Sequence, residues 1–477
     1  MLRMRLDFLG FKISVGANVP ERVNFINIVI LSCGRIAMLS FGLMSGTSMD
    51  AIDVACLETD GEDYIVELGH AKLDYSAETK WLLKAAERAI KAAEGDLRAA
   101  ALHYPNMLQE YLTQELKIEQ KAAAKELARL TTYLQAENKT DNPLSLEAVI
   151  QLSTRLHAQV VKKLLLQIGK QPRETDVIGY HGQTMFHNPA KKITVQIGDG
   201  QYLAELTRIV VVNDFRGCDV AAGGQGAPFA PIYHQALAKR DGKIPLAVVN
   251  CGGIANISLI VGDALDNLIG FDTGPGNGLI DALIRERTFG RETMDRDGQY
   301  GLAGKVNEVV LQGLFNTAIR KNGRNYFQMP VPKSLDIRDM TLIPALAELS
   351  LADACATLEA FTAEMIVQSL ELVNLSSDQV PRHWILAGGG CYNPVIRREL
   401  EQRLYAKFGA DATIQVADEA GWNSEAMEAQ IFAYFAVRSL KNLPLSLPNT
   451  TGVAKPLSGG HVYIPSTGGT AAVERLL

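Results

Sequence analysis

The sequence predicts an α/β protein made of two similar halves with a nucleotide-binding cleft between them. Each half begins with an apolar strand, a glycine-containing turn and a second strand, and each ends with a strand followed by a loop. The order of elements repeats better than the residues themselves. Three glycine-rich loops, at residues 45–48, 250–256 and 273–277, offer backbone amides of the kind that hold phosphate. Two halves with such loops suggest a nucleotide clamped between them.

Length and composition describe an ordinary globular protein. At ~100–200 residues per domain, 477 residues allow two or three domains. Hydrophobic residues make up 47% and charged residues 21% of the chain, which is enough apolar material for a sizeable core. The net charge of −6 and the lack of a basic block argue against nucleic acid or an anionic membrane as a partner.

The cysteines and the N-terminal stretch indicate the cellular compartment of the protein. Six scattered cysteines form no C-x-x-C pair, so we expect reduced, mostly buried thiols and a cytoplasmic protein. The apolar run at residues 25–33 is too short for a ~20-residue membrane span and lies late for a signal peptide. We therefore expect residues 1–37 to be a poorly ordered leader.

The first half, expected at residues 38–244, opens with the hairpin FGLMSGTSMDAIDVAC. Its turn at residues 45–48 combines amides with three hydroxyls, which suits a phosphate, although such a turn is more often only a turn. Asp50 and Asp53 follow within reach of a metal or a reacting group.

A third strand is expected at residues 64–73, followed by helices at 76–98 and 144–169. Residues 100–142 favour helix, with Pro105 as a helix start, and read as a solvated insertion without chemistry.

Two later strands of this half end in polar clusters. The strand at residues 176–184 ends in His181, Gln183 and Thr184, and strand ends of this kind carry sites in open α/β sheets. A second strand, at residues 208–213, runs into Asp214.

Arg216 and the glycine loop at residues 221–228 follow Asp214. An aspartate at the end of a buried strand suits a catalytic base or a metal ligand. The alternative is an aspartate that only caps the following turn.

The second half, expected at residues 245–440, repeats the pattern. A hairpin is expected at residues 246–260, and the loop at 273–277 would present amides to phosphate at the start of the next helix. A strand at residues 383–387 runs into the glycines 388–390, which would lie flat against an adenine or ribose.

A strand at residues 412–416 and a helix at 425–441 complete this half. The tail, residues 441–477, is expected to run back over the surface of the body.

Six motifs in order resemble the anhydro-N-acetylmuramic acid kinase family: GLMSGTSMDAIDVA, GYHGQTMFHNP, VVNDFRGCDVAAGGQGAPFAP, NCGGIANIS, GFDTGPGNGLID and LAGGGCYN. The resemblance runs from about residue 38 to 465. It implies two ribonuclease-H-like domains of the actin, sugar-kinase and heat-shock ATPase superfold, with the active site in the cleft between them. It also implies ATP- and Mg²⁺-dependent conversion of 1,6-anhydro-N-acetylmuramic acid to N-acetylmuramic acid 6-phosphate, in cell-wall recycling in the bacterial cytosol. We also expect a homodimer.

The same resemblance implies roles for individual residues. Asp214 corresponds to the catalytic base, which would activate the water that attacks the anomeric carbon. The expected nucleotide-binding residues are Gly46, Thr47, Ser48, Met49, Asp50, Ala51, Ile52, Asp53, Gly252, Gly253, Asn256, Asp272, Gly274, Gly276, Asn277, Gly388, Gly389 and Gly390. The expected substrate-binding residues are His181, Gln183, Thr184, Arg216 and Glu428. The metal ligands are left open, with Asp50, Asp53 and Asp272 as candidates.

Two departures from the family pattern and two rival functions stay open. Ala51 stands where the family has a glycine, and PKSLDIRD at residues 332–339 replaces the family's PKSTGRE.

One rival function is a plain sugar kinase in which Asp214 deprotonates a hydroxyl group. The other is a non-catalytic ATP-binding regulator or a chaperone-like ATPase, against which the His181 cluster argues because it suits a small-molecule site.

Overall fold

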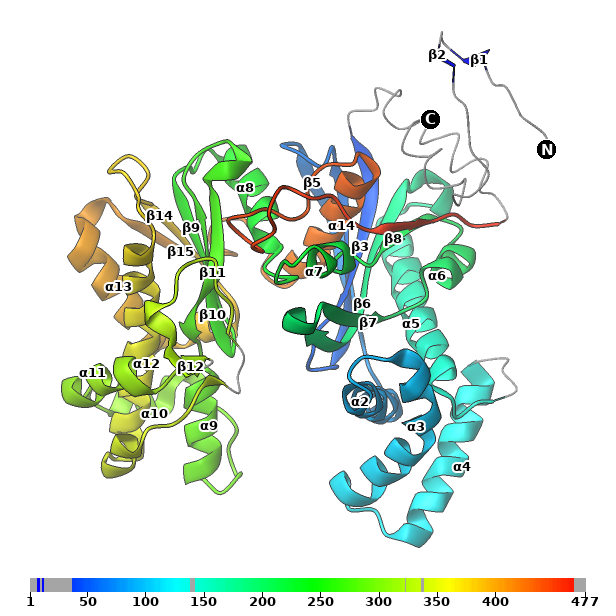
Figure 1. Ribbon diagram of the computed structural model, residues 1–477, viewed down its shortest axis with the longest axis horizontal. Coiled ribbons are helices and arrows are strands. Elements are labelled where there is room, and N and C mark those ends of the chain that lie inside the picture. Colours follow the sequence, from blue (N-terminus) through cyan, green and yellow to red (C-terminus); the bar gives the residue numbers. More distant parts are fainter. Residues whose placement is uncertain are drawn as a thin grey trace.

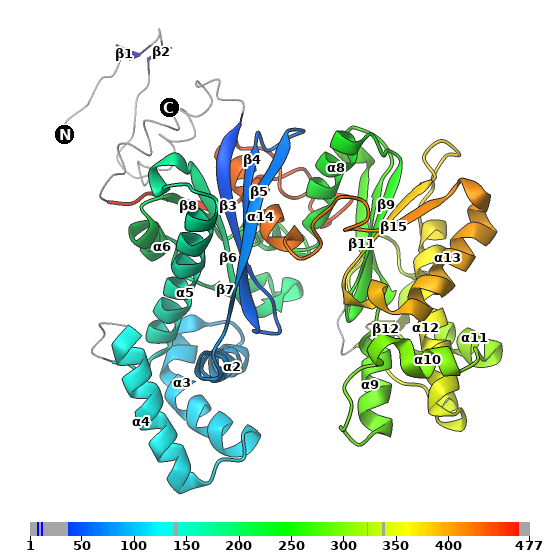
Figure 2. The same ribbon diagram turned by 180° about the vertical axis from the view of Figure 1, so that it is seen from behind.

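The computed structural model describes residues 7–8, 11–12, 37–137, 142–321, 323–335 and 339–466. Two sheets with their helices lie side by side (Figure 1), and the view from behind shows the same division (Figure 2). Strands β1 (Asp7–Phe8) and β2 (Phe11–Lys12) pair with each other. Apart from these strands and residue 37, the expected leader lies outside the described residues, as do residues 467–477 of the tail.

The first sheet has the order β16-β8-β6-β3-β4-β5, with β7 paired to β6. Strands β3, β4 and β5 are antiparallel neighbours, whereas β6 runs parallel to β3 and β8 runs parallel to β6. The bounds are β3 Met38–Ser45, β4 Ala51–Thr59, β5 Ile65–Asp74, β6 Val177–Asn188, β7 Ile193–Ile197, β8 Val210–Asn213 and β16 His461–Tyr463.

The second sheet has the order β11-β10-β9-β14-β15 and repeats the first in topology. Strands β9, β10 and β11 are antiparallel neighbours, and β14 and β15 continue parallel to β9. The bounds are β9 Leu246–Cys251, β10 Ile254–Ile260, β11 Leu268–Pro275, β14 His383–Ala387 and β15 Thr413–Val416. The predicted α/β class and the two ribonuclease-H-like halves are therefore confirmed, because both sheets have three antiparallel strands followed by two parallel ones.

The outer faces of the two sheets are covered by separate sets of helices, each with its own hydrophobic core. The first set is α2 Ala77–Ala92, α3 Leu97–Glu110, α4 Gln120–Glu137, α5 Leu146–Gln167 and α6 Gly200–Thr207. The second set is α9 Gly278–Arg287, α10 Gln299–Ala303, α11 Glu308–Thr317, α12 Leu351–Gln368 and α13 Pro394–Phe408. A short hairpin, β12 Arg320–Lys321 with β13 Arg324–Asn325, follows α11.

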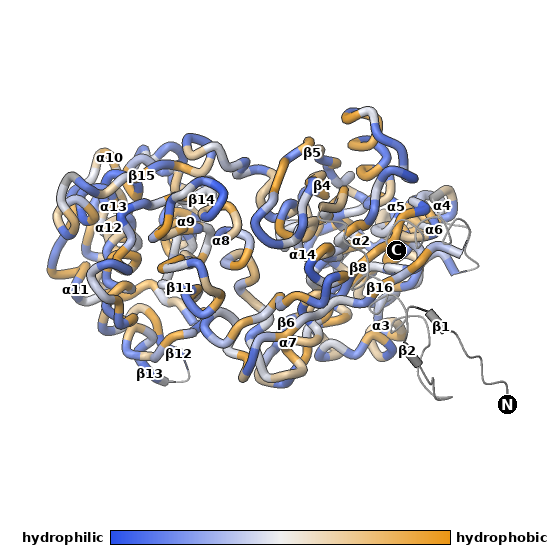
Figure 3. The backbone as a smooth tube through the Cα atoms, turned by 90° about the horizontal axis from the view of Figure 1, so that it is seen from above, coloured by the Kyte–Doolittle hydropathy of each residue, from blue (hydrophilic) through white to orange (hydrophobic). Residues whose placement is uncertain are grey.

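A third core joins the halves and is built around α8 (Ala230–Asp241) and α14 (Met427–Leu440). Both helices lie between the two sheets in the view from above (Figure 3). Helix α8 follows the last strand of the first half but contacts β10 and β11, whereas α14 follows β15 but contacts β3, β4 and β6. Each half therefore contributes a helix to the other half's sheet, and the domain boundaries at residues 244 and 440 stay predictions.

Helix α14 lies with its backbone directly on the first sheet. A Cβ on Gly42 would lie 1.8 Å from the carbonyl oxygen of Ala429, and one on Gly179 would lie 1.9 Å from that of Phe432. Only glycine permits such an approach. The contact fixes the first turn of α14, which carries Glu428, against β3 and β4 at the level of Gly42 and Ala55.

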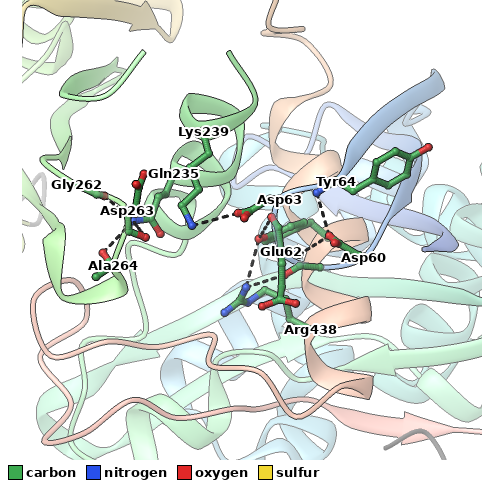
Figure 4. Close-up of polar contacts among 12 residues, drawn as sticks. Asp60, Glu62, Asp63, Tyr64, Gln235, Lys239, Gly262, Asp263, Ala264 and Arg438 are labelled. Atoms are coloured by element: carbon green, nitrogen blue, oxygen red, sulfur yellow. Dashed lines mark hydrogen bonds and ion pairs between the residues drawn. The ribbon is translucent and has the colours of Figure 1, made fainter. Parts of the chain in front are cut away.

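Polar contacts also join the halves, at the turn between β4 and β5 (Figure 4). Lys239 Nζ on α8 lies 3.1 Å from Asp63 Oδ1. Gln235, one turn earlier, donates to the carbonyls of residues 262–264 in the second half at 3.0–3.2 Å. Arg438 on α14 donates to a carbonyl of the β4–β5 turn at 2.7 Å. Helix α8 is thus tied to both halves.

One expectation about local structure was wrong. Pro105 lies inside α3, because Asp96 caps the helix by accepting from the amides of Arg98 and Ala99. In the tail, β16 adds an edge strand to the first sheet beside β8, and the expected bounds of the tail stay a prediction.

The five cysteines in the described residues are free thiols, as expected. Among the same residues, no helix combines the length and apolar character needed to cross a membrane.

Candidate active site

The turn between β3 and β4, the first predicted phosphate segment, is held by β6. Gln183 donates from Nε2 to the carbonyl of Gly46 at 3.0 Å, and Ser45 donates from Oγ to the carbonyl of Gly182 at 3.3 Å. The Gln183 amide donor is thus engaged by the turn, and its role toward a substrate stays a prediction. Met49 is buried, so the turn presents to solvent the side chains of Thr47, Ser48 and Asp50.

The two carboxylates beside this turn differ in environment. Asp50 forms an ion pair with Lys80 at 2.8 Å, and this contact lowers the pKa of Asp50. Asp53, on β4, is half-buried, and burial raises its pKa. Within the described residues Asp53 has no hydrogen-bond or ion-pair partner, so its oxygens remain available to a ligand. Ala51 and Ile52 are buried in β4 and could meet a nucleotide only through their backbone.

Three loops of the second half form one backbone surface at the carboxyl ends of β9, β11 and β14. The amides of Gly276 and Gly278 donate to the Gly253 carbonyl at 3.0 and 3.1 Å, and that of Asn277 donates to Gly252 at 2.8 Å. A Cβ on Gly388 would lie 2.5 Å from Asn250 Oδ1, which brings the third loop against the first. The structure therefore brings together the nucleotide-binding residues predicted in this half.

Asn256 and Asp272 lie at the edge of this surface. They are partners across β10 and β11, and Asn256 also faces Asn250 on β9. The Asp272 carboxylate accepts from the amide of Leu335 at 2.8 Å, and burial raises its pKa to about 6. Asp272 is thus tied to the loop that departs from the family pattern, of which residues 336–338 lie outside the described residues.

The fold does not require glycine at three of the predicted nucleotide positions. A Cβ on Gly46 would meet its nearest atom at 3.6 Å, one on Gly252 at 3.7 Å, and one on Gly389 would meet nothing within 4 Å. None of the three has a positive φ. By contrast, a Cβ on Gly276 would lie 2.0 Å from the Gly252 carbonyl. Open space above a bare backbone is what a closely bound ligand needs.

His181, Arg216 and Glu428 form a cluster between the first sheet and α14. Arg216 donates from Nε to His181 Nε2 at 2.9 Å, so His181 carries its proton on Nδ1 and donates to the Gly182 carbonyl at 2.8 Å. Burial and the Arg216 charge hold the His181 pKa well below 6.5, which keeps the ring neutral. Burial lowers the pKa of Arg216 to about 10, so the guanidinium stays charged at neutral pH.

Glu428 faces this cluster from the first turn of α14. Its side chain is exposed, yet surrounding protein atoms desolvate the carboxylate and raise its pKa, an effect that the Arg216 charge opposes. The charge of Asp53 also acts on it. Thr184 lies on β6, three residues after His181, and accepts from Gln196 at 3.4 Å.

Asp214 follows β8 directly and is separate from that cluster in its contacts. Its φ of +58° lies in the left-handed region, which aspartate tolerates better than most residues. Oδ1 accepts from the amide of Gly217 at 3.1 Å, and Oδ2 lies 3.2 Å from Nδ1 of His461 on β16. The side chain remains 40% exposed. The sequence predicted Asp214 but gave no signal for His461, which lies in the tail.

Two further buried residues support the site and were not predicted as part of it. Asp219 accepts from the amide of Gly226 at 2.6 Å, and its Oδ2 is buried without a hydrogen-bond partner. Lys333 donates to the Tyr326 carbonyl at 2.9 Å, and burial lowers its pKa to about 8. Its sequence context, PKS, matches the family pattern PKSTGRE, and only the residues after it depart from that pattern.

The two predicted parts of the site, the β3–β4 turn and the glycine loops of the second half, do not contact each other through hydrogen bonds of the described residues. The β3–β4 turn has its hydrogen bonds within the first half, and the glycine loops of the second half bond to one another. No group of three or more His, Cys, Asp or Glu side chains in the described part of the chain could hold a metal ion. The cleft between the two sets of residues stays a prediction.

Comparison with known proteins gives a consistent result. The family model described as "Anhydro-N-acetylmuramic acid kinase" matches residues 108–465. Proteins of that name from Methylobacterium nodulans and Phenylobacterium zucineum are each 39% identical, over 90% of this chain and 100% of their own length.

Similar solved structures are far more distant. Xylulose kinase from Lactobacillus acidophilus is 11% identical, with a TM-score of 0.33 over 92% of this chain and 96% of its own. Hexokinase from Schistosoma mansoni is 9% identical, with a TM-score of 0.33 over 84% and 86%.

Proposed function

Because the chain belongs to the anhydro-N-acetylmuramic acid kinase family, we propose that it opens the 1,6-bridge of anhydro-N-acetylmuramic acid and phosphorylates O6 at the expense of ATP. The products are N-acetylmuramic acid 6-phosphate and ADP. The family match over residues 108–465 carries this proposal. Such a step belongs to the recycling of cell-wall sugars in the bacterial cytosol.

The substrate dictates what the residues must do. Its O6 is tied to the anomeric carbon, so no free 6-hydroxyl exists to be phosphorylated. Water must attack the anomeric carbon, the bond from that carbon to O6 must break, and O6 must take the γ-phosphoryl group. The water loses one proton in this step, and a base must accept it.

Asp214 is our candidate for that base. It stands at the carboxyl end of a parallel strand, where α/β sheets place their sites, and its carboxylate is partly accessible. The amide of Gly217 fixes one oxygen, so the carboxylate has a defined orientation. Arg216, His181 and Glu428, which are linked by hydrogen bonding and charge, would hold the sugar nearby.

The nucleotide would lie on the bare backbone of Gly46, Gly252 and Gly389, where the fold leaves open space. When bound, Mg²⁺ neutralises phosphate charge, which is the main aid to phosphoryl transfer. Of the three candidate carboxylates, Asp50 is paired with Lys80 and Asp272 with a backbone amide. Asp53 is therefore the carboxylate best placed to hold the ion, directly or through water.

Turnover in ¹⁸O-water tests the reaction. With anhydro-sugar and ATP, we expect the label in the C1 hydroxyl of the phosphorylated product. Phosphorylation of sugars with a free hydroxyl, and none of the anhydro-sugar, would instead support a plain sugar kinase. ATP binding without any sugar-dependent turnover would support the non-catalytic ATPase.

The variant Asp214→Asn tests the base. Asparagine keeps the shape of the side chain but cannot accept the proton, so we expect loss of turnover, by a factor on the order of 10²–10⁴, with nucleotide binding intact. Near-normal turnover in this variant would remove Asp214 from the mechanism.

A further inference from the structure

The C-terminal strand β16 brings a histidine to the proposed base. Strand β16 pairs antiparallel with β8, with His461 opposite Asn213. The approach is tightly set, because Gly460 has a φ of +90° and a Cβ there would lie 2.6 Å from Val212 Cγ1. The register therefore places His461 beside the residue that follows Asn213, which is Asp214.

The contact completes the hydrogen bonding of the Asp214 carboxylate. Gly217 donates to Oδ1 at 3.1 Å, and His461 Nδ1 lies 3.2 Å from Oδ2. Each oxygen thus has one partner and keeps a second lone pair for a water or substrate proton. The two side chains are 59% and 40% exposed, so the pair contributes little to stability. An effect of removing His461 would therefore point to chemistry more than to folding.

We propose that His461 is a positioning residue for Asp214: its neutral imidazole orients the carboxylate, and its protonated form holds a positive charge against the carboxylate and weakens it as a base. This inference rests on the proposed role of Asp214. It holds whether the proton comes from water or from a sugar hydroxyl. In the neutral ring, the hydrogen bond to Oδ2 places the proton on Nδ1. In the charged ring, the adjacent positive charge stabilises the carboxylate and makes it a poorer proton acceptor.

The surrounding groups set the pH at which this change occurs. Asp214 raises the pKa of His461 above 6.5 through its hydrogen bond and charge. The other titratable groups near the pair are Tyr463 on β16, Cys218 on α7 (Gly217–Ala221), Asp219 on the same helix and Asp199 before α6. Activity limited by Asp214 should therefore fall as the pH falls through the His461 pKa.

Two substitutions separate orientation from charge. Asparagine at 461 places an amide N–H close to the position of Nδ1 but does not titrate, whereas alanine removes the donor. We expect His461→Ala to lower kcat by about tenfold or more at pH 8 with little change in KM. We expect His461→Asn to keep most of kcat at pH 8 and to lose the acidic limb of the pH profile. His383→Asn, which removes a histidine bonded to Thr413 on β15, is the matched control and should leave the profile unchanged.

Imidazole titration by NMR tests the contact without using activity. We expect the His461 pKa to lie above 6.5 in the parent protein and to fall in Asp214→Asn, because both causes that raise it come from Asp214 and the remaining one, burial, lowers it. Parental kcat and an unchanged acidic limb in His461→Ala, or no response of the His461 pKa to Asp214→Asn, would overturn the inference. Normal turnover in Asp214→Asn would refute the proposed role of Asp214 as the base. Normal turnover in His461→Ala together with an inactive Asp214→Asn would refute only the role of His461.

Discussion

Replacing Gly42 by alanine should separate α14 from the first sheet. The added Cβ would lie 1.8 Å from the Ala429 carbonyl oxygen and 2.3 Å from the Ala433 amide nitrogen. Real Cβ contacts are essentially never shorter than 3.0 Å, so strand and helix must part by about 1.2 Å. Both sides of the contact are backbone, so no side chain can rotate to relieve it.

We expect a loss of about 3 kcal/mol or more in the free energy of unfolding, at the upper end of the usual cost of overpacking. Urea unfolding followed by far-UV circular dichroism measures this loss, provided that the transition involving the first sheet is resolved. The change should also raise KM for the sugar, because Glu428 precedes the displaced Ala429 in the first turn of α14.

Gly313→Ala is the matched control for this variant. Gly313 lies inside α11, and a Cβ there would meet only Ile343 Cδ1 at 3.8 Å, so alanine should be neutral or stabilise by up to about 1 kcal/mol. If Gly42→Ala unfolded at the same urea concentration as the parent protein and kept its KM, the close contact of α14 with the sheet would not exist.

Two further predictions concern the second half. Gly389→Ala should leave the unfolding free energy within ~0.5 kcal/mol of the parent value, because its Cβ meets nothing, but should weaken binding of a non-hydrolysable ATP analogue by about tenfold in calorimetry; unchanged affinity would place the nucleotide elsewhere. Glu359 is fully buried, and desolvation raises its pKa from 4.5 to about 9. The folded state therefore keeps a proton that the unfolded state releases, and the resulting contribution to the free energy of unfolding is complete below pH 4.5 and is lost as the pH rises toward 9. Glu359→Gln should therefore unfold with a less negative pH slope than the parent, by up to about 1.4 kcal/mol per pH unit between pH 6 and 8; parallel slopes would show that Glu359 is ionised in the fold.

The sequence predicted the elements that have a clear hydrophobic period and missed those set by distant contacts. Both hairpins and most strands show the alternation or apolar runs of β-structure, and most bounds were placed within one or two residues, although β6 runs four residues beyond its expected end at residue 184. Strand β16, in contrast, is three residues in a tail rich in proline and glycine, and it exists because β8 has a free edge to pair with. A pattern within a segment cannot show such a partner.

The same limit explains the site. The glycine loops were predicted because their composition is local, and their mutual hydrogen bonds follow from the sheet that carries them. The separation of Asp214 from the His181 cluster depends on side-chain directions after β8, which composition does not reveal. The two hairpin turns also differ more than expected, since β3 and β4 are joined by residues 46–50 and β9 and β10 by residues 252–253 alone.

The duplication itself offers a comparison for Asp214. In the second half, the strand in the place of β8 is β15, and it too is followed closely by an aspartate, Asp418. Asp418 accepts from the Ser424 amide at 3.0 Å and from the hydroxyls of Ser424 and Tyr392 at 2.7 Å, so neighbouring residues occupy both its oxygens. That is the turn-capping role which the sequence left open for Asp214.

Asp214 departs from this role in one respect. Only Oδ1 serves the following turn, through Gly217, while Oδ2 faces His461 on a strand that the second sheet lacks in its described residues. Strand β16 is therefore one of the places where the two halves differ. In the second half, neighbouring residues donate to both oxygens of the aspartate that follows β15. In the first half, the aspartate that follows β8 accepts from its own turn with one oxygen only, and its other oxygen faces a titratable partner, an arrangement that suits a base.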